Sequence, residues 1–113
     1  MPAPIPGRPV RGSTTGRPIM AALDLLGRRW MLRILWELRD GPVGFRALQK
    51  ACDGMSSSVL ASRLAELTST GIVTTDDSGD YTLSETGQHL RAAMRPLLDW
   101  SQEWAASLDH QER

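Results

Sequence analysis

A serine-rich stretch between residues 56 and 69 has the residue types and spacing that best fit a chemical task. Leu60, Leu64 and Leu67 follow the period of an α-helix and predict its buried face. Because each residue advances about 100° around the helix axis, the opposite face consists of small residues: Ser58, Ser62, Ala65 and Ser69. A helix with so little outer bulk can approach the base edges in the major groove of DNA, where hydroxyls bond to bases or phosphates.

The first turn of this helix has two interpretations. Ser56 is a good N-cap residue, and Ser57 and Ser58 are compatible with a first turn that has no further role. Alternatively, Ser56, Ser57 and Ser58 belong with Ser62 to a DNA-contacting surface. A serine hydroxyl both donates and accepts hydrogen bonds, so these residues do not indicate which base sequence is bound.

Three cationic side chains near the serines are candidates for contacts with phosphate. Arg46 and Lys50 lie one helical turn apart in the preceding helix and suit contacts that position a protein on the DNA backbone. Arg63 has two competing roles, because Glu66 follows it at i+3 and can pair with it instead. The sequence leaves these two roles of Arg63 open.

The pattern around these residues predicts a winged helix-turn-helix, a mainly α fold with a small β-hairpin wing (α+β). Residues 45–52 have helical spacing, Gly54 interrupts it, and residues 56–69 form the second helix. Residues 72–75 are rich in β-branched side chains suited to a strand, and residues 81–83 return after a polar turn. In such a unit the second helix can enter the major groove.

Three further helices are expected around this unit. Pro18 suits the first turn of a helix that ends before Gly27, and residues 28–39 keep helical spacing up to a Gly-Pro break. Ser84 is a good N-cap for the last helix. Pro96 lies inside that helix, where it removes a backbone hydrogen bond and should kink or divide it.

Length and composition predict one domain with two tails. Residues 1–17 form a basic stretch rich in proline and glycine, which we expect to be flexible, although its arginines could also contact DNA. The winged helix-turn-helix domain with its terminal dimerisation helices is expected over residues 18–108, and a short tail over residues 109–113. A chain of 113 residues leaves room for a second copy to supply further burial, so we expect a homodimer.

The formal net charge of zero hides an asymmetry along the chain. Residues 1–63 carry ten basic and four acidic side chains, whereas residues 64–113 carry three basic and nine acidic ones. The basic part can meet phosphate and the acidic part would avoid it. For any single arginine, an ordinary solvated position remains the simpler interpretation.

Several functional classes are excluded by what the sequence contains. The serines have no base partner nearby, since His89 and His110 follow no nucleophile motif, and a glycine-rich phosphate loop is absent, so we expect neither an enzyme nor a cofactor. Cys52 and the two histidines do not have the spacing of metal ligands. We expect Cys52 to be a buried thiol on the apolar side of its helix. No apolar run suits a membrane span, so we expect a cytoplasmic protein.

Four tryptophans are many for a chain of this length. A role in the core or in an interface is the default for large aromatic side chains, and Trp100 with Trp104 at i+4 could pack across a dimer. The sharper hypothesis is that Trp30, Trp36, Trp100 and Trp104 line an apolar pocket for a small-molecule effector, between the dimer helices and the DNA-binding body.

Five segments, taken together in this order and spacing, resemble the HxlR-type winged-helix transcription regulators, relatives of the MarR-like regulators. The segments are Leu26-Gly-Arg-Arg-Trp30, Gly41-Pro42 followed by Phe45 and Leu48, residues 55–67, residues 81–87, and Pro96 followed by Trp100. The resemblance covers residues 18–104. Many members of the family have a redox-sensing cysteine where this chain has Arg17.

This resemblance implies a homodimeric regulator that binds double-stranded DNA, with the helix near Ser56 in the major groove and the first and last helices forming the dimer interface. The interface residues expected on those helices are Ile19, Leu23, Leu26, Leu90, Met94, Leu97, Leu98, Trp100, Trp104 and Leu108. The alternative is a winged-helix module that serves protein–protein dimerisation and has little or no affinity for DNA. The wing carries Asp76, Asp77 and Asp80. This acidic wing and the neutral net charge favour the alternative, and the basic first half opposes it.

Overall fold

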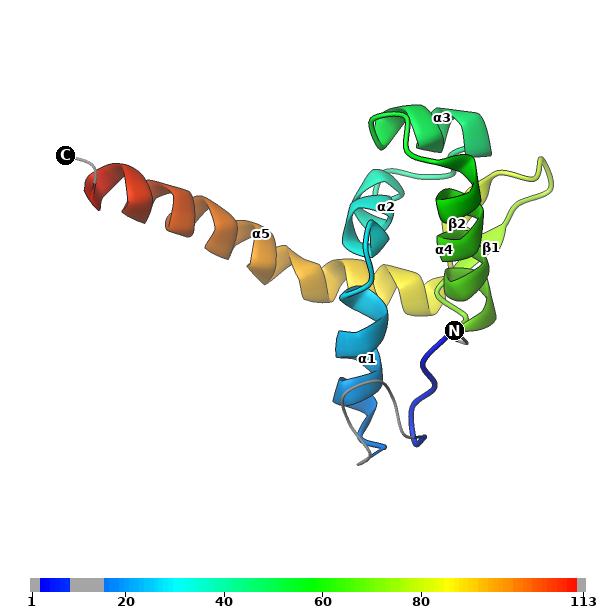
Figure 1. Ribbon diagram of the computed structural model, residues 1–113, viewed down its shortest axis with the longest axis horizontal. Helices are drawn as coiled ribbons and strands as arrows, with labels where there is room; N and C mark the ends of the chain where they lie inside the picture. Colours follow the sequence, from blue (N-terminus) through cyan, green and yellow to red (C-terminus); the bar gives the residue numbers. More distant parts are fainter. Residues whose placement is uncertain (1–2, 9–15, 112–113) are drawn as a thin grey trace.

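A computed structural model describes residues 3–8 and 16–111 of the chain (Figure 1). Residues 1–2 and 9–15 of the predicted N-terminal tail, and residues 112–113 of the predicted C-terminal tail, lie outside this description. Residues 3–8 form no helix or strand. The elements, in chain order, are α1 (Pro18–Leu26), α2 (Met31–Glu37), α3 (Phe45–Ala51), α4 (Ser57–Ser69), β1 (Val73–Thr75), β2 (Tyr81–Leu83) and α5 (Glu85–Gln111).

This order confirms the predicted winged helix-turn-helix fold. The helices α1 to α4 and the hairpin form a body from which α5 projects as a long arm (Figure 1). The 27 residues of α5 span about 40 Å at the α-helical rise. Among the described helices, none combines the length and the apolar character that a membrane crossing requires.

One apolar core lies inside this body. The inward leucines predicted for α4, namely Leu60, Leu64 and Leu67, are each at most 2% exposed. They belong to the same buried cluster as Met31 and Ile34 of α2. Because helices α1 to α4 and both strands of the wing contribute to this core, the orientation of α4 about its own axis is determined by packing.

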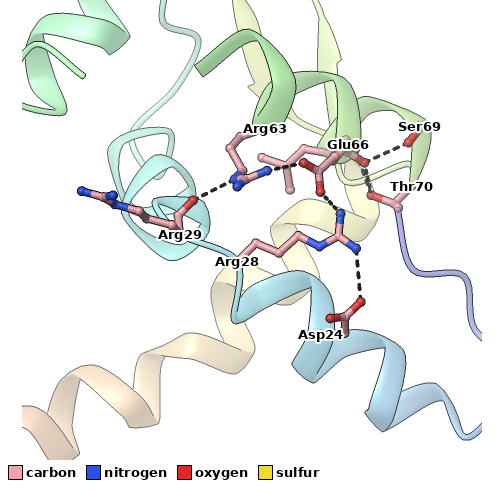
Figure 2. A network of polar contacts seen from close by, with 8 residues as sticks. Asp24, Arg28, Arg29, Arg63, Glu66, Ser69 and Thr70 are labelled. Atoms are coloured by element: carbon pink, nitrogen blue, oxygen red, sulfur yellow. Dashed lines mark hydrogen bonds and ion pairs between the residues drawn. The ribbon is translucent and has the colours of Figure 1, made fainter. Parts of the chain in front are cut away.

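The helix α2 is shorter than the sequence pattern predicts. It begins at Met31 rather than near residue 28, because Trp30 adopts the left-handed conformation with φ +72°. A tryptophan in this region is uncommon and ends any continuous helix there. Arg28 and Arg29 therefore lie in the turn between α1 and α2, which brings the Arg28 side chain and the Arg29 carbonyl toward α4 (Figure 2).

The turn between α3 and α4 contains two consecutive residues with positive φ, Asp53 and Gly54. The amide of Gly54 donates to the carbonyl of Gln49 over 2.9 Å, which closes the end of α3. Ser56 is the N-cap of α4, since its Oγ accepts from the amide of Val59 over 3.4 Å. The helix-turn-helix thus ends and begins where the sequence predicts, within one residue.

The wing is an antiparallel hairpin in which Val73 pairs with Leu83 and Thr75 with Tyr81. Tyr81 also forms a bridge with Val43, which ties the loop before α3 to the wing. At the tip, Asp76 Oδ1 accepts from the amides of Ser78 and Asp80 over 2.9 and 3.0 Å. This carboxylate therefore shapes the turn.

Helix α5 runs unbroken from Glu85 to Gln111 and includes Pro96. The sequence predicts a kink or a division of this helix at Pro96, and the helix is not divided there. It also continues beyond residue 108, where we expected the domain to end. Proline removes one backbone hydrogen bond from a helix, and the remaining bonds keep the residues on both sides of Pro96 in a single helix. Ser84 caps the helix as predicted, with its Oγ accepting from the amide of Gly87 over 3.0 Å.

A network of ion pairs joins α1, the following turn and α4 (Figure 2). Glu66 of α4 is 9% exposed and accepts hydrogen bonds from the guanidinium groups of Arg28 and Arg63. Arg28 also pairs with Asp24 over 3.2 Å, and Arg63 donates to the carbonyl of Arg29 over 2.8 Å. Burial opposes the charge of Arg28, but its carboxylate partners prevail and raise its pKa above the ordinary value.

We predict that Glu66→Ala destabilises the fold by about 3 kcal/mol, because it leaves two partly buried guanidinium groups without their shared carboxylate. The measurement is the free energy of unfolding from urea denaturation. Glu37→Ala is the matched control, since Glu37 pairs with a 41% exposed Arg33 over 3.6 Å and such pairs contribute less than about 1 kcal/mol. Equal losses in the two variants would show that the network has no special role.

We predict that Gly87→Ala destabilises the fold by about 2 kcal/mol or more, although alanine has the higher helix propensity. A Cβ at Gly87 would lie 2.2 Å from the carbonyl oxygen of Ile72, so the start of α5 would have to move away from the wing. The same urea experiment measures this change. A gain in stability from this substitution would contradict the close packing of α5 on that carbonyl.

Candidate nucleic-acid interface

The outer face of α4 is the candidate surface for DNA. Its four predicted members, Ser58, Ser62, Ala65 and Ser69, are all exposed. Their positions follow directly from the burial of the leucines on the opposite face. The result is an open helical surface with hydroxyl groups and no side chain longer than two heavy atoms along its centre.

The serines at the start of α4 have different roles. Ser56 is occupied by the helix cap, and its Oγ also lies 2.9 Å from the Oγ of Ser58. Ser57 is exposed at the first residue of the helix. Of the two interpretations open at the sequence level, the capping role is therefore present for Ser56.

The predicted phosphate-binding side chains divide into two groups. Arg46 and Lys50 are exposed on α3, and in the described part of the chain neither has an ion-pair partner within 4 Å. Arg63 is held by Glu66 and by the carbonyl of Arg29 (Figure 2). The structure thus shows the pairing of Arg63 with Glu66 that competes with a phosphate contact.

Ion pairs within the chain neutralise much of the basic first half. Arg33 pairs with Glu37 and Asp53, while Arg39 pairs with Asp40 and lies over the ring of Trp36 at 4.0 Å. Arg28 and Arg63 share Glu66. The charge asymmetry of the sequence therefore overstates the positive charge that is available to a phosphate backbone. Arg46 and Lys50 of α3 are among the basic side chains that stay exposed.

The thiol of Cys52 is completely buried, as predicted, at the C-cap of α3. Burial raises the pKa of this thiol; the nearby Arg33 opposes the rise, and Glu37 and Asp53 add to it. A raised pKa lowers the fraction of reactive thiolate. Among the described residues, no group of three or more His, Cys, Asp and Glu side chains could hold a metal ion.

The four tryptophans do not gather around one cavity. A cavity of about 550 Å³ lies between α2 and the first half of α5, and Trp36 alone of the four lines it. Trp100 and Trp104 stack on each other farther along α5, with ring centroids 5.5 Å apart, and both are 52% exposed. Trp30 packs against the core.

The residues predicted for the dimer interface also divide into two groups. Leu26 and Leu90 pack against the core, while Leu90, Met94, Leu97 and Leu98 line the cavity. Among the predicted interface residues, the large apolar side chains that are exposed are Ile19, Leu23, Leu97, Trp100, Trp104 and Leu108, at 43 to 57% exposure. They lie on α1 and α5.

The sequence did not single out two arginines as candidate functional residues. Arg91 and Arg95 of α5 line the cavity on the side of α2. Their i,i+4 spacing places them on one flank of a predicted helix. This spacing is the feature of the sequence that indicates a shared basic surface. The cavity itself could not be read from the sequence, since its other wall comes from a helix more than 50 residues earlier.

Solved structures of known regulators share this fold. The quinone-bound YodB of Bacillus subtilis is 36% identical with a TM-score of 0.69, and the match covers 76% of this chain and 97% of that one. A transcriptional regulator of the MarR family from Enterococcus faecalis is 26% identical with a TM-score of 0.72, covering 89% of this chain and 97% of that one.

Sequence comparison gives the same relationship. The HTH-type transcriptional regulator YodB of Bacillus subtilis is 32% identical over 99 residues, which cover 82% of this chain and 88% of YodB. YvaP, another HTH-type regulator of that organism, is 30% identical over 89 residues, which cover 74% of this chain and 82% of YvaP. Residues 25–109 match the HxlR-like helix-turn-helix family. This chain therefore belongs to the HxlR-like family of HTH-type transcriptional regulators, which is not a family of enzymes.

Proposed function

We propose that this regulator binds double-stranded DNA as a homodimer, with α4 of each copy in the major groove. The observation that carries the proposal is the outer face of α4, which is exposed and small over its whole length. Helices that read the major groove must bring hydroxyl, amide or guanidinium groups within hydrogen-bond distance of base edges. Ser57, Ser58 and Ser62 are the groups that α4 offers for this purpose.

Arg46 and Lys50 hold the protein on the DNA backbone in this proposal. Both are exposed, and each lies on α3, the helix that precedes the recognition helix. Contacts of this kind determine position and orientation and carry little sequence information. We leave Arg63 and Ser56 out of the DNA-contacting set, since the first is held by Glu66 and the second caps α4.

The exposed apolar side chains of α1 and α5 support the dimer. Six large apolar residues on these two helices are between 43 and 57% exposed, including the stacked pair Trp100 and Trp104. Large apolar side chains that stay exposed on two helices are unfavourable in water and are typical of an interface. Two copies related by a two-fold axis would present their α4 helices to half-sites about 10 bp apart, which predicts a pseudo-palindromic operator.

We also propose that a small molecule regulates this protein. The relative YodB has been described in a quinone-bound form. In this chain the cavity between α2 and α5 is large enough for such an effector, and its lining residues come from both the DNA-binding body and the proposed dimer arm.

We predict that Arg46→Ala weakens binding to all DNA sequences and reduces the slope of log affinity against log salt by about one for each phosphate that the side chain neutralises. Arg46→Lys keeps the charge and should retain the slope. Ser58→Ala and Ser62→Ala should instead change the preference among operator variants, by about 1 kcal/mol, with the slope unchanged. Mobility-shift titrations on the protein's own upstream DNA, over a salt series, measure both quantities.

Gln102→Ala is the control, because Gln102 is exposed on the flank of α5 opposite Trp100 and Trp104. Equal effects of the arginine and serine substitutions would contradict the proposed division of roles. Absent or salt-insensitive binding by the unaltered protein would instead favour the alternative, a winged-helix module for protein–protein dimerisation.

We predict that Trp100→Glu combined with Trp104→Glu converts the dimer to a monomer, because it places two carboxylates in the apolar interface. Light scattering during size-exclusion chromatography measures the mass. The matched control combines Gln102→Glu with Ala106→Glu, which places the same charges on the opposite flank of α5 and should leave the dimer intact. A measured mass of about 12.4 kDa for the wild-type protein, the mass of one chain, would contradict the proposed dimer.

A further inference from the structure

The cavity between α2 and α5 has an apolar floor and a charged rim. Leu35 of α2 and Leu83 of β2 contribute to the floor and are 4 and 7% exposed. Its volume of about 550 Å³ lies within the range of small-molecule sites, roughly 300 to 1,000 Å³. A ligand bound here would bury most of its apolar surface and still reach the charged rim.

The rim has excess positive charge. Arg39 and Asp40 line the cavity and pair with each other over 3.7 Å, so they neutralise one another. Arg91 and Arg95 also line it, and across the residues that the structure describes neither has a carboxylate within 4 Å. Two like charges at i,i+4 repel each other, and a bound anion would relieve that repulsion.

An aromatic surface faces the same space. Trp36 lines the cavity and is 37% exposed, with the guanidinium of Arg39 over its ring. Arg39 also donates to the carbonyl of Trp36 over 2.8 Å, which holds the two side chains together. An exposed indole beside a leucine floor is suited to pack against a planar apolar group.

The cavity is separate from the proposed dimer surface. At about 100° per residue, Arg91 and Arg95 lie on the flank of α5 opposite Trp100 and Trp104. A second copy seated on the tryptophans would therefore leave the basic flank open. The cavity and the dimer surface share Leu97 at their edge.

We propose that this cavity is a binding site for an aromatic carboxylate, whose ring packs between Trp36 and the leucine floor and whose carboxylate pairs with Arg91 and Arg95. This ligand class would be the effector of the proposed regulator. Binding of the ligand does not depend on the proposed function, but its role in regulation does. The single cysteine is buried, so the site holds its ligand without a covalent bond to a thiol.

Isothermal titration calorimetry on the full-length chain, without DNA, tests this site with 2-naphthoate and its uncharged analogue 2-naphthamide. We expect one ligand per chain and a preference of about ten-fold or more for the carboxylate, as charge-assisted hydrogen bonds predict. Arg91→Gln combined with Arg95→Gln should abolish the preference. Trp36→Leu should weaken the binding of both ligands and leave the ratio of their affinities unchanged.

Arg29→Gln is the matched control, because the Arg29 side chain is exposed and points away from the Glu66 network (Figure 2). It should leave the preference unchanged. No saturable heat with 2-naphthoate, equal affinity for the two ligands, or a preference that survives the double substitution would each overturn the proposal. DNA binding is measured in a separate experiment without ligand. A failure of the ligand site can therefore be distinguished from a failure of the proposed DNA binding.

Discussion

The structure depends on the burial of one face of α4. Leu60, Leu64 and Leu67 enter the core, and Glu66 meets two guanidinium groups beside them. These contacts leave the helix no freedom to rotate about its axis, because a rotation would expose leucines and separate a buried carboxylate from its partners. This constraint leaves the small residues of α4 on its outer face. The proposed contacts with DNA depend on that orientation.

The same network explains why a basic sequence yields a modest basic surface. Arg28 and Arg63 hold α4 against the turn after α1, so these charges stabilise the fold and are not available to phosphate. Arg46 and Lys50 remain exposed on α3. Net charge along a chain predicts partners only after the internal pairs have been removed from the count.

In the two proposals, helix α5 serves both the dimer and the ligand site, because it is long and has two distinct flanks. One flank carries the stacked tryptophans, and the other carries Arg91 and Arg95 above the cavity beside α2. A ligand in that cavity would contact both the arm and the body. Since the arm sets the separation of the two α4 helices in the proposed dimer, occupancy of the cavity and affinity for DNA would be linked reciprocally.

The sequence by itself determined the order of elements, the inward face of α4, the cap at Ser84 and the family, because helical periodicity, capping residues and turn residues are local signals. Tertiary structure decided the rest. The left-handed Trp30 shortened α2, long-range pairing committed Arg63 to Glu66, and the packing of α5 beside α2 created a cavity that only Trp36 of the four tryptophans lines. These features join residues far apart in the chain, and their energies come from burial and charge pairing that no local pattern records.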